Sequence, residues 1–308
     1  MNTLSKILKE PLGAIGIFII LIASFLALFA YLIIPDKTRN ANAMNLSIAN
    51  KNPGFKVQFL VIPIKSEIRQ APLDAWFFGE EKNEELIPIS SFTRKREKLT
   101  YRAYPLIEGP EGEIDLSAFY SFDEIKSQQY VTKRTFWFGT DRFGREMLSR
   151  LIVGSRVSLM VGLLAVFISL IIGIPLGALA AYYGSWPDKF IMWFINVIWS
   201  IPGLLMVIAI TLALGKGFWQ VFVAVGLTMW VEVARVVRGQ VLSTKQMEFI
   251  EAGKSFGFTD ARIILRHILP NVTGPIIVIS ASNFAAAILI EAGLSFLGLG
   301  AQPPQATW

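Results

Sequence analysis

The sequence predicts an all-α polytopic membrane protein with five helical spans and one polar insert between the first two. Of its 308 residues, 53% are hydrophobic and only 17% are charged, whereas a soluble globular chain averages about 25% charged residues. Five apolar stretches are each long enough, at about 1.5 Å per helical residue, to cross a hydrocarbon core of about 30 Å. More than half of the charged residues fall instead in the single segment 35–135.

The first apolar stretch, residues 12–34, carries no charge over 23 residues. It follows Lys6 and Lys9, as the core of a secretory signal would follow its basic residues. However, a signal core is roughly 7–15 residues long and precedes a small-residue cleavage site, which this segment lacks. We therefore expect residues 1–34 to be a retained N-terminal anchor span.

Residues 35–135 are long enough for a small α+β domain outside the membrane. Their composition predicts short strands at 56–65 and 99–107 and a short helix at 121–129. Proline has no N–H for a central strand, so Pro63, Pro88 and Pro105 are expected only at strand edges or ends. This insert is either an extracytoplasmic domain with its own role or an ordered extension without one.

Four further spans are expected within residues 136–308. They are rich in Gly, Ala and Ser, which let helix backbones approach closely where lipid supplies no hydrophobic drive. Their internal prolines are tolerable because neighbouring helices satisfy the freed backbone groups. The expected spans are 157–183, 190–214, 218–237 and 271–290, of which 190–214 is broken by Ile201-Pro202-Gly203.

The distribution of Lys and Arg predicts the orientation, because these residues gather on the cytoplasmic side. The N-terminus carries Lys6 and Lys9, and residues 235–267 carry six Lys and Arg residues. We therefore expect the N-terminus and the loop 239–270 to be cytoplasmic. Four arginines before and at the start of the second span favour the opposite orientation, but they belong to a long translocated segment, where the charge rule weakens. Five spans leave the C-terminus outside, and we expect that the chain is truncated before a sixth span.

The composition argues against catalysis on this chain. There is no cysteine, which excludes disulfides, thiol catalysis and cysteine-ligated metals, and the single histidine leaves no histidine-rich metal or acid–base site. The net charge of +6 fits the cytoplasmic bias of a membrane protein, because no basic stripe alternates with exposed aromatics. We expect no enzyme activity, no metal site and no nucleic-acid partner.

Five motifs, in order along the chain, carry a resemblance to a known family. The first two are residues 138–145 (FGTDRFGR) with 154–156 (GSR), and 234–242 (ARVVRGQVL). The others are 251–270 (EAGKSFGFTDARIILRHILP), 266–271 (RHILPN) and 291–300 (EAGLSFLGLG). The segment 251–270 resembles the E-A-A-x-x-x-G-x9-I-x-L-P loop of binding-protein-dependent ABC importer permeases. Together the motifs resemble the C-type subunit of the dipeptide/oligopeptide/nickel permease family, over roughly residues 1–34 and 136–308.

The resemblance implies the ABC type I importer permease fold and a multi-pass location in the inner (plasma) membrane. It implies that the chain forms half of a translocation pathway for peptides or a related small solute. The implied partners are a second permease subunit in a heterodimer, ABC ATPase subunits and an extracytoplasmic solute-binding protein, besides membrane lipid. The resemblance implies no cofactor on this chain, because ATP and Mg would bind to the ATPase.

The same resemblance implies that the loop 251–270 couples to the ATPase. The coupling residues expected from it are Phe249, Glu251, Ala252, Gly253, Phe256, Gly257, Phe258, Asp260, Arg262, Leu269 and Pro270. The residue types independently predict a stiff, bent element: a helix over 244–256, a left-handed or tightly turned backbone at Gly257 and a second helix capped by Thr259, with Asp260 in its first turn. The three phenylalanines either anchor a partner or pack beneath the loop.

Charged residues near span ends are candidates for supporting roles. Arg235 and Arg238 lie on one helical face, where they pin the coupling loop to acidic groups or lipid phosphates, or simply mark the cytoplasmic side. Glu232, one turn earlier, is expected to pair with Arg235. Glu291 ends the fifth span and is expected to face protein or water, because a carboxylate at mid-membrane costs roughly 2.5–3.5 kcal/mol.

A second group of charges precedes the second span. Asp141, Arg142 and Arg145 flank an expected short outer helix that contains Phe143 and Met147. These charges either contact the solute-binding protein or anchor the helix at the membrane surface.

Several positions depart from the family pattern and leave the solute open. Gly253 replaces an alanine, Trp193 and Asn196 stand where relatives often carry an Arg and an Asp, and the insert exceeds the usual outer loop. An ion-coupled secondary transporter, working without an ATPase, is the alternative. It requires ion-binding carboxylates at the midplane and repeated spans, whereas the central spans are uncharged and no repeat is visible.

Overall fold

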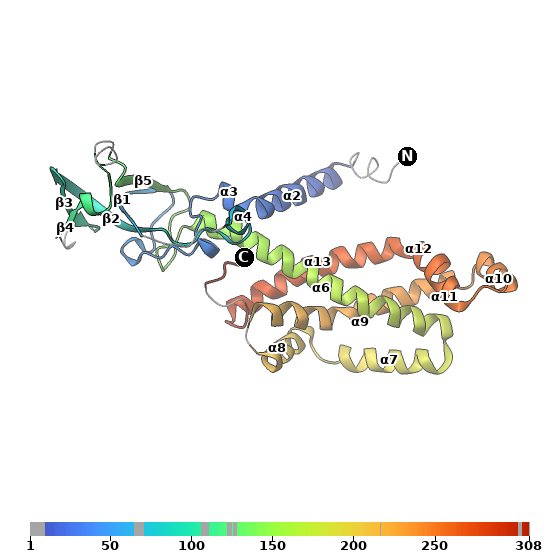
Figure 1. Cartoon of the computed structure of the whole chain (residues 1–308). Coiled ribbons are helices and arrows are strands. Elements are labelled where there is room, and N and C mark those ends of the chain that lie inside the picture. Colours follow the sequence, from blue (N-terminus) through green and yellow to red (C-terminus); the bar gives the residue numbers. More distant parts are fainter. Residues whose placement is uncertain are drawn as a thin grey trace. The chain divides into compact units, whose positions relative to one another are not determined.

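The computed structural model describes residues 10–64, 71–105, 111–121, 125, 128–215, 217–300 and 304–307. Two compact units make up the chain (Figure 1): Met1–Arg156 with Pro304–Trp308, and Val157–Pro303. Lys6 and Lys9, on which the expected orientation partly rests, lie outside the described residues.

The predicted anchor contains two helices of the first unit, α2 (Pro11–Leu28) and α3 (Ala30–Ile33). They are separated at Phe29, whose φ of −101° and ψ of 18° interrupt the regular helix. α2 is apolar along its length and mostly exposed, as is usual for a helix surrounded by lipid.

The rest of the first unit is built on an antiparallel sheet of five strands in the order β4-β3-β2-β1-β5. Successive residues of β1 serve opposite faces: Phe59 packs in one apolar cluster with Ile48 and Phe136, and Leu60 in another with Tyr130. The strands are β1 (Phe55–Pro63), β2 (Glu84–Lys95), β3 (Lys98–Ala103), β4 (Glu111–Asp115) and β5 (Val131–Phe136). Short helices accompany them: η1 (Arg39–Ala41), η2 (Leu46–Ile48), α4 (Pro72–Phe78) and η3 (Leu116–Ala118).

The two predicted strands correspond to β1 and β3, but the expectation for Pro88 was wrong. Pro88 lies within β2, opposite Phe59, and β2 has a neighbour on each side. It is tolerated because the β2–β3 ladder begins only at Ile89, so no ladder hydrogen bond on that side needs a proline N–H. Most of the predicted helix 121–129 lies outside the described residues.

The second unit is helical, and α6 enters it from the first unit. Four helices of the described chain are long and apolar enough to cross a membrane, or five if one bent pair counts as a span. One of these four is α2 of the first unit. From α6 onward, the described helices are α6 (Met147–Tyr183), α7 (Ser185–Trp199), α8 (Gly203–Leu214), α9 (Phe218–Thr244), α10 (Glu248–Ser255), α11 (Asp260–Arg262), the π-helical turn η4 (Ile263–Ile268), α12 (Leu269–Asn271) and α13 (Thr273–Phe296).

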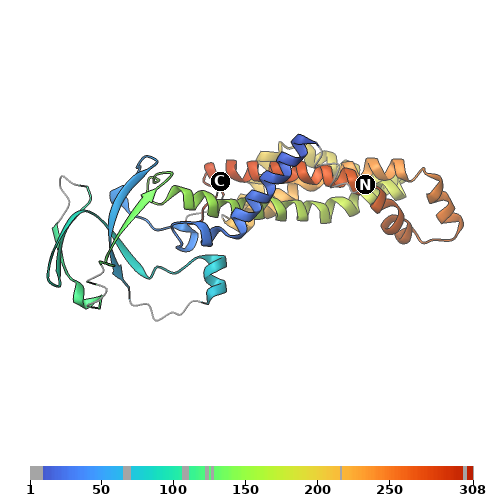
Figure 2. The same ribbon diagram turned by 90° about the horizontal axis from the view of Figure 1, so that it is seen from above.

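Close backbone approach holds the long helices together. α9 and α13 lie side by side in both views (Figures 1 and 2). A Cβ added to Gly173 of α6 would come within 2.6 Å of Val233 Cβ on α9, and one on Gly177 would meet the carbonyl of Ala234. Glycines at these two positions therefore let α6 and α9 pack closely, as the small-residue composition predicted.

Helix boundaries differ from the expected spans in two informative ways. The break expected at residues 201–203 bends the span 190–214 sharply, because its two helices, α7 and α8, meet at an angle of 89°. Pro202 lacks the N–H that a continuous helix requires and restricts Ile201 before it. α9 also continues to Thr244, so residues 239–244 of the expected loop are helical.

Candidate functional site

The segment between α9 and α13 folds into two short helical pieces joined by a sharp turn. α10 ends in a Schellman motif, in which Phe258 N–H donates to Gly253 O at 3.0 Å and Gly257 N–H to Lys254 O at 2.9 Å. Gly257 has a φ of +75°, a left-handed conformation that favours glycine. The predicted left-handed turn is therefore confirmed. In both views α10 and α11 lie beyond the same end of α9 and α13 (Figures 1 and 2).

The second helical piece begins at the predicted cap. The Thr259 side chain accepts a hydrogen bond from Arg262 N–H at 3.4 Å, and Asp260 lies in the first turn. The helix then passes through η4 and α12 and breaks at Val272, two residues after Pro270. The first piece differs from the expectation, because residues 245–247 form a turn and only Glu248–Ser255 are helical.

The base of this loop is built into the core of the second unit. Ile250, Ile263 and Ile268 are at most 1% exposed and belong to one apolar cluster with Ala181 of α6 and Val237 of α9. Burying each such side chain stabilises the packed state by roughly 1.5–3 kcal/mol. The loop is therefore fixed to the ends of two long helices.

Polar contacts with Tyr182, at the end of α6, reinforce that attachment. The Tyr182 hydroxyl donates to Asp260 Oδ1 at 2.7 Å. The Lys245 ammonium donates to the Tyr182 carbonyl, and the Lys254 ammonium lies 5.8 Å from the centre of the Tyr182 ring. Residues from both halves of the loop thus contact a single α6 residue.

The three phenylalanines differ in burial. Phe258 is half-buried: its ring stacks on His267 at 5.5 Å between centroids, and the Arg262 guanidinium carbon lies 4.0 Å from the ring centre. A Cβ on Gly253 would lie 3.3 Å from the Phe258 ring, which explains the small residue there. Phe256 and Phe249, by contrast, are 79% and 41% exposed.

Most of the predicted coupling residues lie on the surface of the loop, together with two other apolar side chains. Met247 and Leu265 add exposed apolar side chains, 48% and 66% accessible, to those of Phe249 and Phe256. Among the predicted coupling residues, Gly253 is buried and Phe258 and Leu269 are half-buried; Phe249, Glu251, Ala252, Phe256, Gly257, Asp260, Arg262 and Pro270 are exposed.

The basic pair on α9 is engaged by α7. Arg238 makes a two-pronged ion pair with Asp188, with N···O distances of 2.6 and 2.7 Å. Arg235 donates to Asn196 Oδ1 at 2.7 Å, and its guanidinium carbon lies 3.5 Å from the centre of the Trp199 ring. The expected Glu232–Arg235 pair was wrong, because α7 presents Arg235 with an acceptor and an aromatic face.

Glu291 of α13 faces protein, as expected. Its carboxylate is 1% exposed and accepts hydrogen bonds from Ser295 at 2.7 Å and from Ser158 of α6 at 3.5 Å. It therefore joins α13 to α6 within the second unit.

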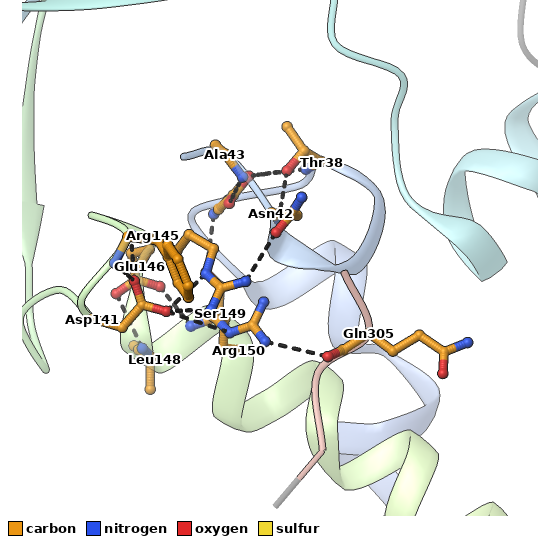
Figure 3. Close-up of polar contacts among 12 residues, drawn as sticks. Thr38, Asn42, Ala43, Asp141, Arg145, Glu146, Leu148, Ser149, Arg150 and Gln305 are labelled. Carbon is orange, nitrogen blue, oxygen red and sulfur yellow. Dashed lines mark hydrogen bonds and ion pairs between the residues drawn. The ribbon is translucent and has the colours of Figure 1, made fainter. Parts of the chain in front are cut away.

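The charges before α6 form a connected network in the first unit (Figure 3). Arg145 Nη2 lies 2.7 Å from Asp141 Oδ2, and Arg145 Nη1 donates to Asn42 Oδ1 at 3.1 Å. Glu146 accepts from Ser149 N–H in the first turn of α6. The expected separate outer helix was wrong, since residues 139–146 form a loop with one turn at 142–143, and the helix that follows is α6 itself.

Burial in this network acts to raise the pKa of Asp141, but hydrogen bonds from Arg145 and from the N–H of Phe143 outweigh it and hold the pKa below its ordinary value. Asp141 and Arg145 are thus occupied with each other. Arg142 is the exposed member of the predicted trio, with its guanidinium carbon 4.8 Å from the Phe143 ring centre.

Sequence reasoning missed Tyr182, Asp188 and the three buried isoleucines. Asp188 had a usable signal, because it is the only acidic residue between Glu146 and Glu232 and an isolated charge near a span needs a partner. Tyr182 and the isoleucines had none, since they are apolar or aromatic residues in apolar surroundings.

The fold and this loop define a polytopic helical membrane protein with an ordered helical loop outside its long helices. Comparison with known sequences shows that residues 173–308 match the binding-protein-dependent transport system inner membrane component family.

Several curated relatives match about three fifths of the chain. The glutathione transport system permease protein GsiD of Pectobacterium atrosepticum is 38% identical over 63% of this chain and 64% of its own length. The oligopeptide transport system permease protein OppC of Bacillus subtilis is 36% identical over 61% and 62%. The dipeptide transport system permease protein DppC of the same species is 45% identical over 60% and 58%. The matched part thus spans less than two thirds of these relatives.

Among solved structures, an inward-facing conformation of the MetNI methionine ABC transporter aligns with a TM-score of 0.46 at 20% identity. The alignment covers 50% of this chain and 77% of that one.

Proposed function

We propose that this chain is a permease subunit of an ATP-driven ABC importer for peptides or a related small solute. The family domain at 173–308 supports this, as do relatives named as glutathione, oligopeptide and dipeptide permeases. The chain supplies half of the pathway and no catalysis, and ATP with Mg binds to the partner ATPase.

The observation that carries the proposal is the construction of the loop between α9 and α13. Its base is locked into the apolar cluster of α6 and α9, whereas its surface presents Phe249, Phe256 and Leu265. Exposed aromatic and aliphatic anchors on a rigid support are what a docking interface requires. A force applied to α10 is passed to α6 and α9, because Ile250 is packed between the loop and those helices.

The same function implies the rest of the assembly. The loop and the N-terminus face the cytoplasm, and the sheet-containing insert lies outside the cell membrane. A solute-binding protein docks on that side, with the exposed Arg142 among its contacts, and a second permease completes the pathway.

Reconstitution tests the proposal. The chain, co-purified with its second permease, ATPases and binding protein in proteoliposomes, is expected to take up a labelled tripeptide only when ATP is supplied inside. The chain alone is expected to hydrolyse no ATP. Uptake that follows an imposed ion gradient without ATP would instead establish the secondary-transporter alternative.

A further inference from the structure

Glu232 occupies an unusual place on α9. Between Gln220 and Arg238, Glu232 is exposed and all the remaining residues of this helix are buried or half-buried. The only carboxylate of this candidate span is therefore also its one exposed side chain over that stretch.

The basic residues near Glu232 do not neutralise it. Arg235 is committed to Asn196 and Trp199, and Arg238 to Asp188. Within the described chain no hydrogen bond or ion pair reaches the Glu232 carboxylate. The Glu232 carboxylate can therefore interact with water, a solute or another subunit.

The helix surface around Glu232 changes character at that residue. Residues seven and eleven positions apart share a helical face. Val225 and Val221, on the side toward the start of α9, are buried, whereas Gly239 and Ser243, on the side toward the loop, are exposed. Glu232 therefore lies where this face of α9 changes from buried to exposed, and the exposed part carries no large apolar side chain.

Lipid is a poor neighbour for such a residue. A carboxylate within the hydrocarbon costs roughly 2.5–3.5 kcal/mol, so ionisable residues in spans usually face protein or water. The exposed glycine and serine beyond it offer no apolar surface to acyl chains, and the neighbouring Gln240 is also exposed. Water is the neighbour that satisfies all of these groups.

We propose that Glu232 lines the water-filled inner mouth of the solute pathway and binds a cationic group of the solute, an ammonium or a guanidinium. The proposal rests on the permease function proposed above. A carboxylate in a narrow passage with low-dielectric walls concentrates cations and repels anions. Solutes carrying an extra positive charge are therefore preferred over those carrying an extra negative one.

Thiol labelling tests the location without requiring transport. The chain has no cysteine, so Glu232→Cys introduces its single thiol, which is treated in the assembled transporter with a trimethylammonium methanethiosulfonate reagent and followed by mass spectrometry of this chain. Ala234→Cys, at a fully buried position of α9, and Leu289→Cys, at a 73% exposed apolar position of α13, are the controls. Because only a hydrated thiolate reacts, the Glu232→Cys thiol is expected to be modified at least about tenfold faster than either control.

Modification no faster than that of the controls overturns the proposal, and it is the result expected if a basic side chain of the second permease covers Glu232. This outcome leaves ATP-driven uptake by the wild-type transporter intact, so it is distinguishable from failure of the proposed function.

Uptake of charged peptides tests the role. Glu232→Gln is expected to raise the KM for Ala-Lys-Ala about tenfold, equivalent to about 1.4 kcal/mol. The KM for Ala-Glu-Ala is expected to stay unchanged or to fall. Glu232→Asp should retain the preference, and Glu85→Gln, which removes an exposed carboxylate from β2, should not alter it. Equal losses for both peptides, or no loss, overturn the assignment.

Discussion

Truncation of Phe256 separates docking from folding. The ring is 79% exposed, and its nearest aromatic neighbour, Phe258, lies 6.4 Å away between centroids. Phe256→Ala therefore removes little packing within the chain, and its effect on the free energy of unfolding should stay within about 0.5 kcal/mol. If the ATPase covers the ring, roughly 150 Å² of apolar area is lost from the interface, worth about 4 kcal/mol at about 25 cal/mol per Å².

Because ordering costs offset part of that gain, we expect a loss of about 2 kcal/mol, which raises the Kd for the ATPase about 30-fold. The assay is surface plasmon resonance of the purified ATPase on the permease pair in nanodiscs, with thermal unfolding measured in parallel. Phe296→Ala is the matched control, since it removes a phenylalanine that is 91% exposed at the other end of α13. An unchanged Kd for Phe256→Ala, or an equal rise for Phe296→Ala, would refute the reasoning.

Three further predictions concern the supports of the loop and the network before α6. In Gly257→Pro, the proline cannot adopt a φ of +75° and lacks the N–H that donates to Lys254 O. We expect this variant to insert normally into the membrane and to hydrolyse ATP without solute uptake. Uptake coupled to ATP hydrolysis in the variant would contradict this. Exchanging the charges of Asp188 and Arg238 should recover most of the Tm lost in either single reversal, since a double-mutant cycle for such a pair gives a coupling of about 1–3 kcal/mol; additive losses would count against it. The lowered pKa of Asp141 means that its stabilising effect is present above its unfolded pKa of about 3.9 and fades as pH falls through the lower folded value. The Tm difference between wild type and Asp141→Asn should therefore persist at pH 7 and shrink below about pH 4, and a difference independent of pH would exclude this origin.

The parts of the site that were predictable depend on local chemistry. Gly257 and Thr259 act through their own backbone conformation and the next few residues, so their turn and cap could be identified from the sequence. The break between α7 and α8 was equally local, since Pro202 removes a backbone donor, and it was expected at residues 201–203. Its angle of 89° was not expected, because the apolar composition continues through the break. Hydropathy reports burial in lipid or protein and is insensitive to helix direction.

The charged residues show where sequence reasoning ends. Spacing placed Glu232 and Arg235 on one face at three residues apart, but α7 supplies Asn196 and Trp199 at a closer approach, and the local pair does not form. Such competition between a local partner and one from about 40 residues away is decided by how two helices pack.

By itself the sequence determined that this is a helical membrane protein, where most of its helices lie, and that an ordered, bent, polar loop follows α9. These follow from composition, periodicity and the conformational limits of Gly, Pro and Thr, which act within a few residues. Only the tertiary structure decided that Phe258 packs inward while Phe256 projects outward, and that Glu232 is the one exposed residue of α9 between Gln220 and Arg238. The reason is geometric: exposure depends on how each helix is rotated about its axis against neighbours distant in sequence, and no local pattern fixes that rotation.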